Sequence, residues 1–265
     1  MLKGLNVSIP GGVRVGVVGR TGAGKSSLFA ALLRTGDVEG GEIFLDGVPI
    51  SRPPLPVLRK AIALVPQEAY LFSGTVRRNL DPLGLYKEEE LWEALEAVGL
   101  KGGGTSTSTS TSSTSTNSGS STSSSITSLE APVAEGGLNM SGGERQLLTI
   151  ARALLKKHGA ALVLMDEATA SLDPARDALV QNALRAAFSG SGSGGEPRNS
   201  PTVLIIAHRV HTVMDCDYIL GLRGGRVVEF APPGELLKDE HSLFAGLVRE
   251  STSNSSSSCS QQHPQ

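Results

Sequence analysis

The residues that could do chemistry begin with Gly19–Ser26, which read GRTGAGKS and fit the pattern G-x-x-x-x-G-K-[ST]. An apolar run, Val13–Val18, precedes them, and a helix-like stretch, Ser27–Leu33, follows. Glycines let the backbone curl with its N–H groups facing inward, toward the spot at which the helix N-terminus points. This context predicts a loop that holds the β-phosphate of a nucleotide, with Lys25 at the β/γ oxygens and Ser26 on Mg²⁺. The alternative is a Gly-rich turn without a ligand.

A second candidate is a pair of acids at the end of an apolar strand. Ala161–Glu167 read ALVLMDE. In an enzyme with a phosphate loop, Asp166 would hold the Mg²⁺ shell, and Glu167 would lie near the attacking water as a general base. The alternative is a solvated strand end that carries two acids.

A third candidate opens a helix at Asn139–Gln146, which read NMSGGERQ. Ser141 and Glu144 fit a capping box, which satisfies the N–H groups at a helix start. The Gly142–Gly143 pair also exposes such N–H groups, and the helix dipole favours a phosphate there. A chain with a phosphate loop does not need a second phosphate site of its own. This pattern therefore predicts contact with a nucleotide held by another domain.

Composition limits the function classes. The chain has 265 residues and a formal net charge of -2, which suits one α/β domain with appendages and gives no support for nucleic-acid binding. Cys216 and Cys259 are its two cysteines, so no disulfide framework is expected. No apolar run approaches the roughly 20 residues that cross a bilayer. The N-terminus, MLKGLNVSIP, has no signal-peptide pattern.

Alternating apolar strands and amphipathic helices position these motifs, as expected of a mostly parallel sheet covered on both faces. The expected strands are Lys3–Ile9, Arg14–Val18, Glu42–Leu45, Ile62–Val65, Ala161–Met165 and Val203–Ala207, and a hairpin of Tyr218–Leu222 and Arg226–Phe230 that turns at Gly224-Gly225. The expected helices are Lys25–Leu33, Glu88–Val98, Gly142–Lys156, Pro174–Phe188 and Ser242–Arg249.

Three segments break this pattern because Ser, Thr and Gly dominate them. Gly102–Ser128 cannot bury enough apolar surface to offset its ordering entropy, so we expect a disordered insertion. Ser189–Pro201 is a shorter Gly/Ser insertion, and Ser251–Gln265 is a low-complexity tail that we also expect to be disordered.

The order of the motifs carries more information than any single one. The phosphate loop, VPQ at Val65–Gln67, SGGE, LMDE, SLD at Ser171–Asp173 and AH at Ala207–His208 follow one another. Over nearly all of Met1–Glu250, the chain resembles the nucleotide-binding domain of an ATP-binding cassette (ABC) protein. The stretches GRTGAGKSS, LFSGTVRRNLDP and NMSGGERQLLTIARALL are similar to the second nucleotide-binding domain of the multidrug-resistance-associated (C) subfamily of exporters.

The resemblance implies ATP and Mg²⁺ as cofactors and assigns the site residues. The catalytic roles fall on Lys25, Gln67, Glu167 and His208. Contacts with the chain's own nucleotide fall on Gly19, Arg20, Thr21, Gly22, Ala23, Gly24, Lys25, Ser26 and Ser27. Ser141, Gly142, Gly143 and Asp173 would act across a dimer interface, and Ser26, Gln67 and Asp166 would surround the metal.

The same resemblance implies a P-loop NTPase (RecA-like) core with a mostly parallel sheet, a partial antiparallel β subdomain and a helical subdomain at about residues 68–157. Partners would be a second nucleotide-binding domain, head to tail, and transmembrane domains, and no nucleic acid. The domain would work at the cytosolic side of a membrane and be soluble and cytoplasmic in isolation. Two other functions stay open: a soluble ABC ATPase, and a nucleotide-binding module that does not hydrolyse ATP.

Two departures from the family pattern stand out. The signature LSGGQ has Met140 in place of Leu and Glu144 in place of Gln. The family also stacks adenine on an aromatic residue upstream of the first strands, and this chain begins downstream of that position. We therefore expect an N-terminally truncated domain in which ATP binds weakly.

Overall fold

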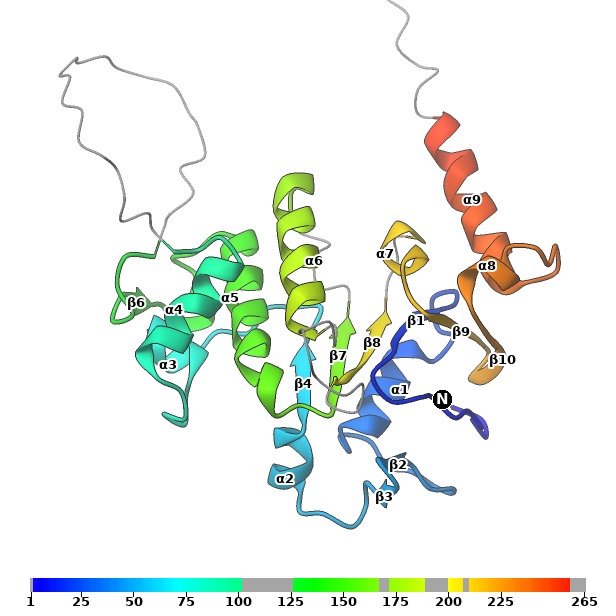
Figure 1. Ribbon diagram of the computed structural model, residues 1–265, viewed down its shortest axis with the longest axis horizontal. Coiled ribbons are helices and arrows are strands. Elements are labelled where there is room, and N and C mark those ends of the chain that lie inside the picture. The colour runs from blue at the N-terminus through cyan, green and yellow to red at the C-terminus, as the bar shows by residue number, and fades with distance from the viewer. Residues whose placement is uncertain (1, 102–125, 167–171, 189–199, 207–209, 258–265) are drawn as a thin grey trace, which may run out of the picture. The chain divides into compact units, whose positions relative to one another are not determined.

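Figure 1 shows the computed structural model of the chain. The structure describes residues 2–101, 126–166, 172–188, 200–206 and 210–257. No helix within these ranges is both long enough and apolar enough to cross a membrane.

The chain forms two compact units. Unit 1 comprises Met1–Gln67, Lys156–Ala168 and Ala186–Gln265. Unit 2 comprises Glu68–Leu155 and Thr169–Arg185. Unit 2 therefore consists of two separate segments of the chain, and the predicted helical subdomain at about residues 68–157 stays a prediction.

Unit 1 is built on a six-stranded sheet in the order β10-β9-β1-β8-β7-β4. Its strands are β1 (Arg14–Val18), β4 (Ile62–Val65), β7 (Leu162–Asp166), β8 (Thr202–Ile206), β9 (Tyr218–Arg223) and β10 (Arg226–Ala231). All neighbours pair in parallel except β9 and β10, which form the expected antiparallel hairpin. The central strands are fully buried, as Val15, Leu164 and Leu204 illustrate. This is the expected mostly parallel α/β fold.

Short elements complete unit 1. Its helices are α1 (Lys25–Leu32), α2 (Leu55–Lys60), the 3-10 turn η2 (Lys156–His158), α7 (Val210–Met214), α8 (Pro233–Leu236) and α9 (Leu243–Ser257). A separate antiparallel pair, β2 (Phe44–Leu45) and β3 (Val48–Pro49), turns through Asp46 and Gly47 with φ values of 51° and 76°. Asp-Gly favours such a turn because both residues tolerate positive φ. This pair is the partial antiparallel sheet that the sequence predicts.

Unit 2 is mainly helical. Its elements are β5 (Gly74–Thr75), α3 (Val76–Leu80), α4 (Glu88–Ala97), β6 (Pro132–Val133), the 3-10 turn η1 (Glu135–Gly137), α5 (Gly142–Leu155) and α6 (Pro174–Phe188), whose last three residues belong to unit 1. Helices α4 and α5 lie against each other. Leu91 and Leu95 of α4 and Leu147 and Ile150 of α5 are buried in the core of this unit, as expected of amphipathic helices.

One predicted strand is wrong. Lys3–Ile9 does not form a strand, although its sequence alternates as a strand would. The backbone N–H group of Lys3 donates to the carbonyl of Gly225 at 2.7 Å. A strand is defined by a ladder of such bonds to a neighbour, and one bond does not make a ladder.

The structure describes only parts of the three segments that we expected to break the fold. Residues 102–125 of the predicted disordered insertion 102–128 lie outside the described residues, but Ile126 is only 8% exposed and its N–H group donates to the carbonyl of Leu100. Ile126 is apolar, so burial fixes it in place. Most of the second insertion, residues 189–199, also lies outside the described residues. We expected the tail to be disordered from Ser251 onward, but α9 continues to Ser257.

Candidate functional site

The phosphate loop joins β1 to α1. Gly22 and Gly24 have φ values of 80° and 105°, in the left-handed region where a glycine has no steric penalty. Gly24 occupies the cap position of α1 and offers no side-chain hydrogen bond to the helix. No side chain at this cap position accepts a hydrogen bond from the first N–H groups of α1, which suits these groups to an anion.

Lys25 is the buried cation of this loop, with 7% of its surface exposed. Its Nζ donates to the carbonyl of Gly19 at 2.7 Å and to that of Arg20 at 3.4 Å. Burial lowers the pKa of the Lys25 ammonium, and the negative charge of Asp166 opposes that shift. Lys25 and Asp166 thus interact electrostatically, although 141 positions separate them in the sequence.

The residues expected around a metal follow the carboxyl ends of neighbouring strands. Asp166 ends β7, and Gln67 follows β4 by two residues. Val65 pairs with Met165 in the register of the sheet, so these strands end level with each other. Ser26 lies in the first turn of α1, directly after the loop that follows β1. Hydroxyl, amide and carboxylate oxygens are ligands that Mg²⁺ accepts, together with water and phosphate oxygens.

The structure describes most of the other predicted site residues but not all of them. Arg20, Thr21, Gly22 and Ser27 are exposed along the loop and α1, and Ala23 is buried. Glu167 and His208 lie outside the described residues. Within the described ranges, no three His, Cys, Asp or Glu side chains form a cluster that could hold a metal ion without a ligand's help.

In unit 2, the segment before α5 forms the predicted capping box. The N–H group of Ser141 donates to Glu144 Oε2 at 2.8 Å, and the N–H group of Glu144 donates to Ser141 Oγ at 3.2 Å. Glu144 is buried, whereas Ser141 and Gly142 are exposed. The acid at the position where the family has Gln therefore has a structural role in the helix start.

The structure brings the SLD segment next to this helix start, which the sequence did not reveal. A side chain at Gly143 would lie 3.6 Å from Leu172 Cδ2 and 3.9 Å from Arg176 Nη1. Asp173 Oδ1 accepts the N–H of Arg176 at 3.1 Å, and its Oδ2 lies 3.6 Å from Arg176 Nε. Sequence reasoning missed Arg176, because an Arg three residues after an Asp reads as an ordinary helix pair.

A second missed feature is a network around Asn79, which is fully buried. Its side-chain amide accepts from the N–H of Phe72 at 2.8 Å and donates to the carbonyl of Phe72 at 2.7 Å. Arg152 Nε donates to the carbonyl of Asn79 at 2.6 Å, and its guanidinium lies over the Phe72 ring. The network holds Phe72 and Tyr70 with 58% and 70% of their surfaces exposed.

Comparison with known proteins gives the following matches. The family model described as "ABC transporter" matches residues 2–170. "ABC transporter C family member 13" of Oryza sativa subsp. indica is 41% identical over 97% of this chain and 15% of its own length. "Metal resistance protein YCF1" of Saccharomyces cerevisiae is 41% identical over 94% of this chain and 15% of its own length. The chain thus spans about 15% of the length of such relatives.

A solved structure is similar over most of the chain. It is described as "Structure of a bacterial Atm1-family ABC exporter with ATP bound", and it is 28% identical in sequence. The alignment has a TM-score of 0.75 and covers 95% of this chain and 39% of that one. The expected fold class and the resemblance to the C subfamily are confirmed by these matches.

Proposed function

The chain belongs to the ABC transporter family, and from that membership we propose that it binds and hydrolyses ATP to drive transport across a membrane. The observation that carries this proposal is Lys25. Its ammonium is buried at the start of α1 and bonded to carbonyls of the phosphate loop. A polyphosphate would supply the negative charge that this buried cation lacks in its immediate hydrogen bonds.

In this proposal the site residues of unit 1 bind the phosphates, hold the metal ion and take part in hydrolysis. Gly19–Ser27 cradle the phosphates, and Lys25 turns from the Gly19 carbonyl to the phosphate oxygens. Ser26, Gln67 and Asp166 hold Mg²⁺, which supplies charge neutralisation on the transferred phosphoryl group. Glu167 takes a proton from the attacking water, and His208 contacts the γ-phosphate; both assignments rest on the sequence motifs.

We propose a separate role for the helix start in unit 2. Ser141, Gly142 and Gly143, with Asp173 beside them, contact ATP held by a second nucleotide-binding domain. The exposure of Ser141, and the use of Glu144 for the cap and not for a ligand, support this role. Hydrolysis would then need two domains and rise steeply with protein concentration.

The transport context also belongs to the proposal. The C family relatives favour a transporter over a soluble ATPase. We propose that transmembrane domains are the partners, that the chain works at the cytosolic side of a membrane, and that Tyr70 and Phe72 belong to the surface that meets the partner. The exposure of two aromatic side chains on a segment held by hydrogen bonds supports that choice.

Binding of labelled Mg-ATP and release of phosphate test the proposal. Lys25→Ala should lose measurable binding, because it removes the buried cation, and Lys60→Ala, at an exposed lysine of α2, should bind as the parent does. Ser141→Arg should keep ATP binding but lose phosphate release, and Ser51→Arg serves as its control. Binding without phosphate release in the parent, at any protein concentration, would instead support the non-hydrolysing module.

A further inference from the structure

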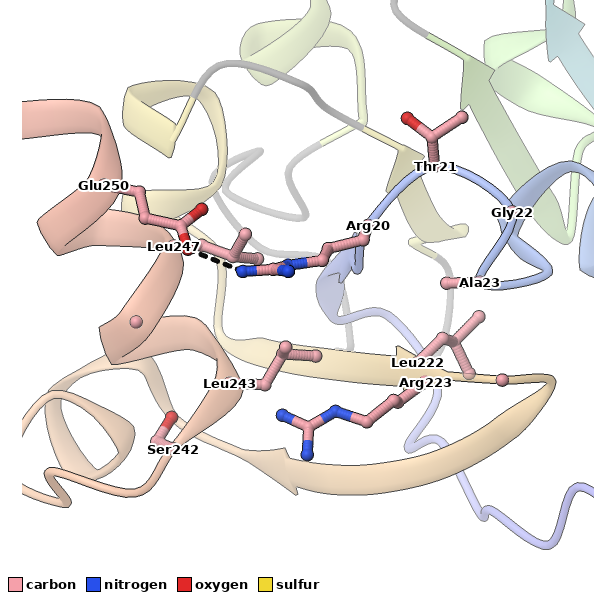
Figure 2. Close-up of a pocket in the computed structure, with 12 residues that line it drawn as sticks. Arg20, Thr21, Gly22, Ala23, Leu222, Arg223, Ser242, Leu243, Leu247 and Glu250 are labelled. Carbon is pink, nitrogen blue, oxygen red and sulfur yellow. Dashed lines mark hydrogen bonds and ion pairs between the residues drawn. The ribbon is translucent and has the colours of Figure 1, made fainter. Parts of the chain in front are cut away.

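Unit 1 contains a cavity of about 600 Å³ beside the phosphate loop. Figure 2 shows its three walls: the loop at Arg20–Ala23, the end of β9 at Leu222 and Arg223, and the start of α9. Cavities of this size accommodate small organic ligands. The phosphates of a nucleotide are expected at the N–H groups of the loop, and the side chains that line the cavity determine which further ligand fits beside them.

The lining combines cations with apolar side chains. Leu222, Leu243 and Leu247 supply the apolar surface. Arg223 extends from β9 toward the start of α9, on the side of Leu243 (Figure 2), and no hydrogen bond or ion pair engages its guanidinium within the described part of the chain. An Arg without a partner beside apolar surface is a ready site for a carboxylate or sulfonate.

A second guanidinium is held by an exchangeable partner. Arg20 Nη2 lies 2.7 Å from Glu250 Oε1, and the two side chains are 75% and 59% exposed. Exposed pairs of this kind contribute little to stability. Two guanidinium groups and one carboxylate therefore leave the cavity with an excess of one positive charge. An incoming anion could replace Glu250 at Arg20 with little loss.

The walls are held by contacts that do not involve the lining side chains. The N–H groups of Leu243 and Phe244 donate to the carboxylate of Glu229 at 3.0 and 2.9 Å, which fixes the start of α9 on β10. A side chain at Gly221 would lie 2.4 Å from Glu229 Cγ, so glycine is needed for this approach. The loop is equally close to β9, because a side chain at Gly19 would lie 2.4 Å from the carbonyl oxygen of Leu222.

We infer that this cavity binds a small organic anion with an apolar body, with its acidic group on Arg223 and Arg20 and its body against the three leucines. This goes beyond the proposed ATPase function, since the ligand occupies the space between loop, β9 and α9 and leaves the N–H groups of the loop to the phosphates. Because Arg20–Ala23 belong to both sites, the ligand and ATP should alter each other's affinity by the same factor.

The probe is 8-anilinonaphthalene-1-sulfonate, a sulfonate on an aromatic body, titrated into the full chain by fluorescence and calorimetry. One molecule per chain should bind. Arg223→Gln should weaken binding about tenfold, on the scale of one charged hydrogen bond. Arg226→Gln, on the same hairpin but outside the lining, is the matched control and should leave binding unchanged. Glu250→Gln should tighten binding several-fold, because it removes the competing carboxylate.

Two results would overturn the inference. Equal affinity in the parent, Arg223→Gln and Glu250→Gln proteins, with unchanged thermal melts, would place the dye elsewhere on the chain. Complete competitive displacement of the dye by Mg-ATP would make the cavity part of the nucleotide site. A partial and saturable change in dye affinity with Mg-ATP is the expected outcome. If Arg223→Gln lowers the melting temperature, Leu247→Asp provides an independent change of the lining.

Discussion

Ser141 and Glu144 cap each other at the start of α5, because each side chain accepts a hydrogen bond from the backbone N–H group of the other residue. The serine of this pair is exposed and the glutamate is buried. One residue is thus free to meet a ligand while the other fixes the helix. The same four positions therefore serve both the structural and the functional interpretation of the SGGE motif.

The first prediction tests the structural role of Glu144 by measuring protein stability. Glu144→Ala should cost about 1 kcal/mol through loss of the cap, and lower the melting temperature by about 2–4 °C in a domain of this size. Glu144→Gln should leave it nearly unchanged, since the amide oxygen still accepts the Ser141 N–H. Glu93→Ala, at an exposed position of α4, is the control. A large loss in Glu144→Gln would mean that the charge matters and not the cap.

The second prediction concerns pH. The folded-state pKa of Lys25 is lower than its unfolded value, chiefly because the ammonium is buried. At pH values between the lowered pKa and 10.5, the unfolded chain therefore binds more protons than the folded chain. The free energy of unfolding consequently rises with pH in that window. Lys25→Met should remove this rise and raise the melting temperature at pH 7, while abolishing ATP binding.

Thermal melts of both proteins at pH 7 and at pH 9.5 measure the effect. Other groups titrate equally in the two proteins, so the difference between them isolates Lys25. A Lys25→Met protein that is less stable than the parent at pH 7 would show that the two carbonyl hydrogen bonds of Lys25 outweigh its burial.

The third prediction is that Glu167→Gln separates binding from hydrolysis. The amide has nearly the same size but cannot accept a proton from the attacking water, and loss of a general base costs about 10²–10⁴ in rate. Mg-ATP should still bind and should hold two domains together for longer. Phosphate release and size-exclusion chromatography with Mg-ATP, on the variant and the parent protein, measure both effects. Hydrolysis at the parental rate would point to another base.

The fourth prediction concerns the network that holds Tyr70 and Phe72. Asn79→Ala leaves the N–H and carbonyl groups of Phe72 without their partner, so it should destabilise the protein by about 2 kcal/mol or more. Hydrogen exchange should quicken first in residues 70–76. Asn182→Ala, at an exposed site of α6, is the matched control and should do neither. Unchanged exchange in Asn79→Ala would show that Arg152 alone holds the segment.

The fifth prediction concerns the Ser-rich insertion. Ile126 pairs with Lys101, and its N–H group lies 2.8 Å from the carbonyl oxygen of Leu100, so the ends of the insertion are adjacent. Replacing residues 102–125 with about six Gly and Ser residues should leave the melting temperature equal or slightly higher, since a fourfold shorter loop lowers the closure cost by about 1 kcal/mol. The same linker with Ile126→Ser should melt lower. A loss of several degrees in the first variant would show that the insertion contributes to the fold.

Local patterns in the sequence were enough to predict most elements. The bounds of β4 and α6 match the expected ranges, and the β9–β10 hairpin turns at the predicted glycine pair. The order of the motifs was enough to indicate the family. These features depend on residues close together in the chain, where periodicity, capping and turn chemistry act.

Only the tertiary structure decided which distant residues meet. The strand order brings Asp166 close enough to influence the charge of Lys25, and Lys3–Ile9 joins none of the sheets in the described part of the chain. The cap that Glu229 gives to α9, and the bond from Arg152 to Asn79, join residues that share no local pattern. Such contacts are fixed by topology and by the need to pair every buried polar group, and both are properties of the whole fold.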